Sequence, residues 1–349
     1  MTPDLHIRTD GRAGRITLTR PKALNALSHQ MSLDIEDALD AWAGDDAVDL
    51  VILDARGDKA FCAGGDIARI HAQGTAGELD GPRGFWRDEY RMNAKLADYA
   101  KPVVSFMQGF VMGGGVGLGC HTHYRVVSDT TRMAMPECGI GLMPDVGGTL
   151  LLARAPGRAG EYIGLSGARM GAADAIHAGF ADCFIPEAMW ADVIASLCLN
   201  GDPDLVRKAA LSPPESTLPA LAGEIDALFD APDLPSLIQA LEEAGTEFAT
   251  ATLKSLRHHS PLSMACTLAA VRAMRGDHDI RDALRQEYRF THRSLDMGDL
   301  LEGIRAQIID KDRNPRWKHD IASLTAADVA AMLAPLGAAE LTFEREDKP

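Results

Sequence analysis

The sequence has fewer basic than acidic residues and no long uninterrupted apolar run, and each of these features excludes a class of partner. Lys and Arg number 35 against 50 Asp and Glu, which leaves a formal net charge of −15. A negative field repels phosphate groups and anionic lipid headgroups, so neither nucleic acid nor a membrane is expected as a partner. The weakly polar stretch 103–120 is interrupted by Gln108 and by six glycines. It therefore does not predict a helix that crosses a bilayer.

Paired cysteines and common nucleotide or hydrolase signatures are also absent. The six cysteines lie far apart, with no spacing typical of a zinc site or a disulfide framework, so reduced thiols and no bound metal are expected. Neither a P-loop nor the GxGxxG fingerprint occurs, and GLSGA at 164–168 ends in alanine where a serine-hydrolase elbow needs glycine. The N-terminal residues lack the apolar segment of a secretory signal. We therefore expect a cytoplasmic protein of bacterial type, or one of an organelle matrix.

Strand and helix patterns alternate over the first 200 residues. A strand pattern is followed by a helix pattern that begins after Ser28 as N-cap, then by a buried strand pattern, and this order recurs further along the chain. The segments are strands at 15–20, 50–55, 103–110 and 124–129, and helices at 28–43 and near 113–121. The alternation predicts an α/β fold, built as a βα-alternating spiral or as layers.

The pattern changes after about Pro203. Strand-like runs disappear, and helical patterns separated by prolines continue to the end of the chain. We therefore predict a core domain over residues 1–200 and an all-helical region over residues 201–349.

Two glycine-rich segments suggest places where backbone N–H groups contact a ligand. In KAFCAGGDI (59–67), Gly64 and Gly65 permit close approach to the backbone, and the alternative is a glycine turn with Asp66 as N-cap of the next helix. GFVMGGGVGLG (109–119) follows a strand and begins a helix, and its alternative is tight helix packing through small residues.

A third segment, MPECGIGLMPDVGGTLLLARAPG (135–157), carries two acids that each follow a proline. Glycines bend the chain between Glu137 and Asp145, so the two carboxyl groups can come together. Asp145 also stands where the N-cap of a helix over 146–155 belongs, and this alternative stays open. The alternative for Glu137 is a solvated loop acid.

These three segments, in this order, resemble the enoyl-CoA hydratase/isomerase (crotonase) superfamily. The resemblance covers nearly the whole chain and includes further motifs: RPKALNAL (20–27), KPVVSFMQGFVMGGGVGLG (101–119) and SGARMGAADAIHAGFADCFIP (166–186). It implies a crotonase-like spiral of ββα units followed by an all-helical C-terminal region. Because relatives assemble into oligomers, it also implies some self-association.

The resemblance implies roles for particular residues. Two backbone N–H groups, at the positions of Gly65 and Gly114, are expected to hold the thioester oxygen as an oxyanion hole, each worth about 3–4 kcal/mol in comparable sites. CoA is expected to be bound as part of the substrate, with no separate cofactor. The residues carried over as CoA contacts are Lys22, Ala23, Leu24, Ala63, Asp66 and, from the C-terminal region, Lys311.

One departure from the superfamily pattern narrows the expected activity. Hydratases use a glutamate in the glycine-rich helix, and this position is Gly117 here, which carries no side chain. Glu137 keeps the second glutamate position, and Asp145 follows eight residues later. This pattern, together with EGIRAQIIDKDRNPRW (302–317), resembles the 3-hydroxyisobutyryl-CoA hydrolase branch, which acts in valine catabolism.

The resemblance therefore implies an acyl-CoA thioester hydrolase that forms 3-hydroxyisobutyrate and CoA. Glu137 is expected to attack as a nucleophile or to activate water, and Asp145 to move a proton, orient the water or bind the substrate hydroxyl. Two alternatives stay open: an enoyl-CoA hydratase or isomerase, and a CoA-binding scaffold without catalytic activity.

Overall fold

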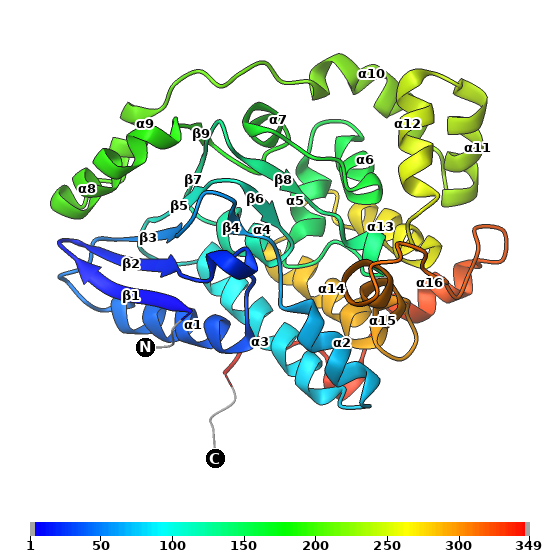
Figure 1. The fold of residues 1–349 in the computed structure, drawn as a ribbon, viewed down its shortest axis with the longest axis horizontal. Helices are drawn as coiled ribbons and strands as arrows, with labels where there is room; N and C mark the ends of the chain where they lie inside the picture. Colours follow the sequence, from blue (N-terminus) through cyan, green and yellow to red (C-terminus); the bar gives the residue numbers. More distant parts are fainter. Residues whose placement is uncertain (1–3, 346–349) are drawn as a thin grey trace. The chain divides into compact units, whose positions relative to one another are not determined.

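The computed structural model describes residues 4–345 (Figure 1). Contacts between residues divide the chain into two compact units, and each unit is made of three separate segments. The sheet unit comprises Met1–Asp66, Asp88–Ala134 and Arg169–Thr217, and the helical unit comprises Ile67–Arg87, Met135–Ala168 and Leu218–Pro349. The boundary predicted near residue 200 stays a prediction, since this grouping follows compactness rather than position along the chain.

The sheet unit contains two sheets that are built by one repeated motif. The motif is a pair of consecutive strands, of which the first joins a six-stranded sheet and the second a three-stranded sheet, and it occurs three times along the chain. The larger sheet has the order β1 (Leu5–Asp10), β2 (Ala13–Leu18), β3 (Leu50–Ala55), β5 (Val103–Met107), β7 (Tyr124–Val127) and β9 (Cys183–Phe184). The smaller sheet has the order β4 (Ala60–Cys62), β6 (Phe110–Met112) and β8 (Arg132–Ala134).

The pairing directions follow from this repeat. Only β1 and β2 pair antiparallel among the described strands, and all other neighbouring strands are parallel. Parallel neighbours need a connection that returns the chain to the same end of the sheet, which a ββα unit provides. The predicted spiral of ββα units is therefore confirmed.

Several predicted elements have the expected bounds. The strand at 50–55 is β3, and α1 (His29–Ala43) begins after Ser28, whose Oγ accepts a hydrogen bond from the Met31 N–H. The strand predicted over 103–110 is wrong in one respect, because β5 ends at Met107 and β6 begins at Phe110. Gly109 between them has φ +57°, and a Cβ there would collide with the Lys59 carbonyl oxygen. The turn therefore requires glycine and sends the chain from one sheet to the other.

A hydrophobic core lies between the larger sheet and α8 (Trp190–Asn200). Leu50, Ile52 and Phe106 of the sheet are buried against apolar side chains of α8. The rings of Phe106 and Trp190 meet edge to face, with their centroids 5.2 Å apart. The remaining helices of the sheet unit are α4 (Gly114–Gly119), α7 (Ala172–His177), α9 (Asp204–Ala209) and the part of α3 (Asp80–Ala97) from Asp88 onward.

Every regular element in the described part of the helical unit is a helix. From residue 218 onward this agrees with the predicted helical region. The main helices are α2 (Ile67–Thr75), α5 (Gly148–Arg154), α6 (Ala159–Ser166), α10 (Leu218–Phe229), α11 (Leu234–Ala244), α12 (Glu247–Leu256), α13 (Pro261–Ala273), α14 (Ile280–Ser294), α15 (Leu300–Ile304) and α16 (Ala326–Leu333). Within residues 4–345, no helix combines the length and hydropathy needed to cross a bilayer.

Candidate active site

The two glycine-rich segments of the sheet unit meet at Gly65 and Gly114. Gly65 follows β4 and pairs as an isolated bridge with Leu27, whereas Gly114 begins α4. A Cβ built on Gly114 would lie 3.6 Å from the Gly65 nitrogen. Among residues 4–345, neither amide donates a hydrogen bond to the protein. Two backbone donors on neighbouring segments are thus without a protein acceptor in the described part of the chain and could both donate to a ligand oxygen.

The alternative explanation of the glycine run, tight packing, holds for two of its members. A Cβ on Gly115 would collide with the Cys62 carbonyl oxygen, and one on Gly119 would collide with the Met107 sulfur. These glycines let α4 pack directly on the strands beneath it. Gly114 differs from them because the atom nearest to its missing Cβ is a carboxyl oxygen, and Leu27 Cδ2 and the Gly65 nitrogen follow at 3.5 and 3.6 Å.

That carboxyl belongs to Glu89 of α3, which the sequence analysis did not identify. A Cβ on Gly114 would lie 2.7 Å from Glu89 Oε1, and Glu89 is only 2% exposed. The signal in the sequence is an acid on the buried stripe of a helix, three residues after Trp86 and four before Asn93, both of which are buried. Buried carboxyl groups are rare unless they have a partner or a function.

The predicted CoA contacts in RPKALNAL (20–27) lie next to those in the segment that follows β4. The Ala63 N–H donates to the Leu24 carbonyl oxygen over 3.1 Å, while Lys22 and Ala23 are exposed. Leu24 has φ +52°. Asp66 forms an ion pair with Arg20 at 3.4 Å, and sequence reasoning missed this arginine.

The buried Asn25 fixes the left-handed backbone conformation at Leu24 and Asn25. Its Nδ2 donates to the Ala60 carbonyl oxygen over 2.8 Å, and the residue has φ +54°. Lys311, the remaining predicted contact, is exposed with φ +58° and belongs to the helical unit. All six CoA contacts stay predictions.

The helical unit brings Glu137 and Asp145 together. Both side chains are 5% exposed, so the alternative of a solvated loop acid is wrong for Glu137. The N-cap alternative for Asp145 is also wrong, because α5 begins at Gly148 and its N-cap is Gly147. Val146 and Gly147 have φ +55° and +80°, and this left-handed turn delays the start of the helix.

The surroundings of Glu137 disfavour its charged form. Burial raises the pKa of Glu137 well above its ordinary value, and the nearby charge of Asp145 raises it further, with a smaller contribution from Glu287. Glu137 Oε2 is buried and has no hydrogen-bond partner within residues 4–345. A buried carboxyl oxygen without a partner is uncommon and is typical of a group that meets a ligand or a reacting atom.

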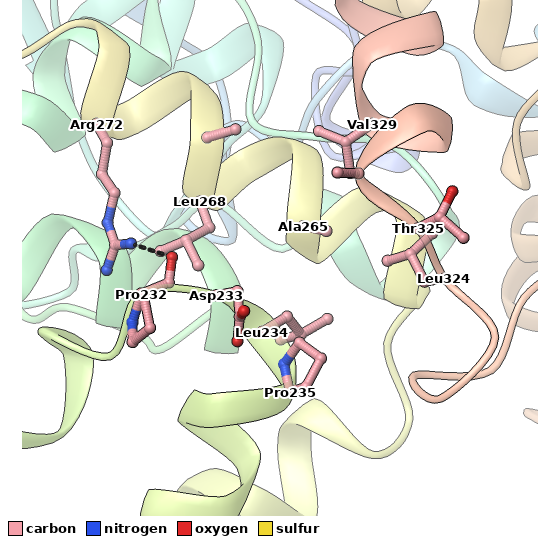
Figure 2. A pocket seen from close by; sticks show the side chains of 12 residues that line it. Pro232, Asp233, Leu234, Pro235, Ala265, Leu268, Arg272, Leu324, Thr325 and Val329 are labelled. Atoms are coloured by element: carbon pink, nitrogen blue, oxygen red, sulfur yellow. Dashed lines mark hydrogen bonds between the residues drawn. The ribbon is translucent and has the colours of Figure 1, made fainter.

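A separate cavity of about 330 Å³ lies in the helical unit (Figure 2). It is lined mainly by apolar side chains from the first turns of α11 and α16 and from α13, and Arg272 stands at one side. The Arg272 guanidinium donates to the carbonyl oxygens of Phe229, Ala231 and Pro232. None of the predicted site residues lines this cavity. No cluster of three or more potential metal ligands occurs within residues 4–345.

Comparison with known proteins identifies the family of the chain. A family model described as enoyl-CoA hydratase/isomerase matches residues 13–333. The mitochondrial 3-hydroxyisobutyryl-CoA hydrolase of Gallus gallus is 36% identical over 326 residues, which make up 90% of this chain and 84% of the chicken protein.

Two solved structures share the fold over nearly the whole chain, each with a TM-score of 0.93. An enoyl-CoA hydratase from Rhodobacter sphaeroides 2.4.1 is 54% identical and covers 97% of this chain and 99% of its own. A carnitinyl-CoA dehydratase from Mycobacterium thermoresistibile is 42% identical and covers 98% of this chain and 99% of its own. The chain therefore belongs to the enoyl-CoA hydratase/isomerase family.

Proposed function

We propose that the protein is an acyl-CoA thioester hydrolase that converts 3-hydroxyisobutyryl-CoA to 3-hydroxyisobutyrate and CoA. The observation that carries this proposal is the buried pair of Glu137 and Asp145, combined with Gly117 at the helix position where hydratases of the family carry an acid. The name of the chicken relative supports the same activity and its acyl group. The reaction belongs to valine catabolism.

In the proposed reaction, the carboxylate of Glu137 either attacks the thioester carbon itself or activates the water molecule that attacks it. As a nucleophile it displaces the CoA thiolate and forms a mixed anhydride, which water then hydrolyses to the free acid and Glu137. As a general base it takes a proton from the water that attacks the carbon. Asp145 delivers or shuttles a proton, orients the water or contacts the substrate hydroxyl. The amides of Gly65 and Gly114 stabilise the oxygen as it becomes negative.

The CoA moiety supplies the binding energy, and it arrives as part of the substrate. Lys22, Ala23, Leu24, Ala63 and Asp66 contact it in this proposal, and Lys311 contacts its phosphates. The reaction needs no further cofactor and no metal. A cytoplasmic or organelle-matrix location and self-association also stay predictions, and the chicken relative is mitochondrial by name.

Enoyl-CoA hydration is the competing activity, because the two solved structures are named a hydratase and a dehydratase. Product analysis separates the activities. With 3-hydroxyisobutyryl-CoA, 3-hydroxypropionyl-CoA and an enoyl-CoA as substrates, we expect free thiol from the hydroxyacyl thioesters, with the branched one preferred. Loss of enoyl absorbance without thiol release would assign a hydratase instead. Binding of CoA without any turnover would assign a non-catalytic scaffold.

The proposed role of Glu137 predicts a pH dependence that Asp145 controls. Because the carboxylate is the active form, kcat/KM falls as the pH drops through the raised pKa of Glu137. Asp145→Asn removes a negative neighbour that raises this pKa, so the acidic limb of the profile should move to lower pH. Maximal kcat should fall as well. The exposed Asp192→Asn is the control, and an acidic limb that stays in place in folded Asp145→Asn contradicts the assignment.

A further inference from the structure

Glu287 of α14 binds the turn that carries Asp145, although about 140 residues separate the two in sequence. Its Oε2 accepts the Gly147 N–H at 2.7 Å. Its Oε1 accepts both the N–H and the hydroxyl of Thr149, at 2.8 and 2.6 Å. Glu287 is fully buried, and α14 packs against α5 in the helical unit (Figure 1).

Within the turn the Gly148 N–H donates to the Asp145 carbonyl oxygen over 2.7 Å, but two features of its residues oppose this conformation. Val146 is β-branched and has φ +55°, a conformation that costs free energy in such residues. Gly147 is the N-cap of α5 but has no side chain with which to accept a hydrogen bond from the first amides of the helix. Glu287, which lies on a different helix, therefore accepts the hydrogen bonds that an N-cap side chain would accept.

The hydrogen bonds around Glu287 have a defined direction. Gln286 Nε2 donates to the Thr149 hydroxyl oxygen over 3.0 Å, which leaves the hydroxyl proton to point at Glu287. Both carboxyl oxygens of Glu287 thus act as acceptors. Burial raises the pKa of Glu287 to about 8, the three donors oppose this rise, and Asp145 adds to it. No Lys or Arg pairs with Glu287 among residues 4–345.

Glu137, at the other end of the loop, is held by different residues. The Ser260 N–H donates to the Cys138 carbonyl oxygen over 3.0 Å, and the Ser260 hydroxyl donates to Asp299 at 2.6 Å. Loss of Glu287 should therefore displace Asp145 more than Glu137.

We propose that Glu287 is a positioning residue that fixes the Asp145–Thr149 turn and thereby the place of Asp145 relative to Glu137. This inference rests on the proposed hydrolase function. Glu287 does not touch the substrate in this proposal, and it acts through Asp145.

The test is a double-mutant cycle between Glu287 and Asp145, read as thiol release from 3-hydroxyisobutyryl-CoA. Glu287→Gln keeps one acceptor oxygen but turns an NH₂ group toward a backbone N–H, so kcat should fall by about tenfold or more because the acid is misplaced. KM should change by less than about twofold, since the predicted CoA contacts are untouched. In the Asp145→Asn background the same substitution should have little further effect, because both act on one group.

A second pair of variants guards against loss of folding. Thr149→Val removes the hydroxyl and with it the hydrogen bonds to Glu287 and from Gln286, whereas Thr149→Ser keeps both. We expect kcat to fall in the first and to stay near wild type in the second, with both proteins folded by circular dichroism.

Three outcomes are distinguishable. A folded Glu287→Gln variant with wild-type kcat overturns the positioning role. So do losses that multiply with Asp145→Asn, since they would indicate an independent structural effect. If the wild-type protein releases no thiol, the proposed function itself fails, and this inference fails with it.

Discussion

Glu137→Gln is expected to lower kcat for thiol release from 3-hydroxyisobutyryl-CoA by about a thousandfold or more. An amide neither attacks the thioester carbon nor takes a proton from water. The substitution keeps the shape of a side chain that is 5% exposed, and it removes an acid whose burial raises its pKa. The folded state should therefore remain intact. Steady-state kinetics together with urea unfolding measure the two effects separately.

The control for this variant is Glu243→Gln, an exposed acid on α11, which should leave kcat unchanged. Trapping with hydroxylamine then distinguishes the two roles of Glu137. A mixed anhydride at Glu137 reacts to give a hydroxamate on the peptide that contains residue 137, which mass spectrometry detects, whereas activation of water gives none. Wild-type turnover in folded Glu137→Gln would remove Glu137 from the mechanism.

Gly114→Ala is expected to lower kcat by about a hundredfold, a loss comparable to removing an oxyanion-hole donor. The added methyl group would stand 3.6 Å from the Gly65 nitrogen and 2.7 Å from Glu89 Oε1. It would narrow the space beside the Gly65 amide, where the thioester oxygen binds in the proposed mechanism. The neighbouring carboxyl is the end of a flexible side chain, so the protein should adapt and stay folded.

The matched control is Gly223→Ala in α10, where an added Cβ meets no atom within 4 Å. There we expect unchanged turnover and a free energy of unfolding higher by about 0.5–1 kcal/mol, because alanine favours a helix over glycine. Comparing kcat with the unfolding midpoint in both variants separates chemistry from folding. Wild-type kcat in Gly114→Ala would mean that the amide pair is not the oxyanion hole.

Local patterns in the sequence were sufficient for much of the fold. The bounds of β3 and α1, and the N-cap at Ser28, follow from hydrophobic spacing and capping chemistry that involve only nearby residues. The break between β5 and β6 was missed, because Gly109 lies in an otherwise continuous strand pattern. The need for glycine there comes from the Lys59 carbonyl, which is distant in sequence.

The same distinction between local patterns and contacts with distant residues applies to the candidate site. Motif and spacing identified Glu137 and Asp145 as candidates, and the family resemblance added the amides of Gly65 and Gly114. The capping preference of aspartate wrongly permitted Asp145 as an N-cap. A left-handed turn at Val146 and Gly147, held by Glu287, prevents it. The sequence around Glu89 and Glu287 does not indicate which distant residues these two acids contact.

The sequence by itself therefore determined the repeated strand–helix units, the family and the chemical types available for catalysis, because these depend on short-range periodicity and on motifs. Only the tertiary structure decided which carboxyl groups are buried together, which of their oxygens lacks a partner and which backbone amides donate no hydrogen bond within the described residues. Burial and proximity are set by residues far apart in the chain, and these are the quantities that shift a pKa and make a group reactive.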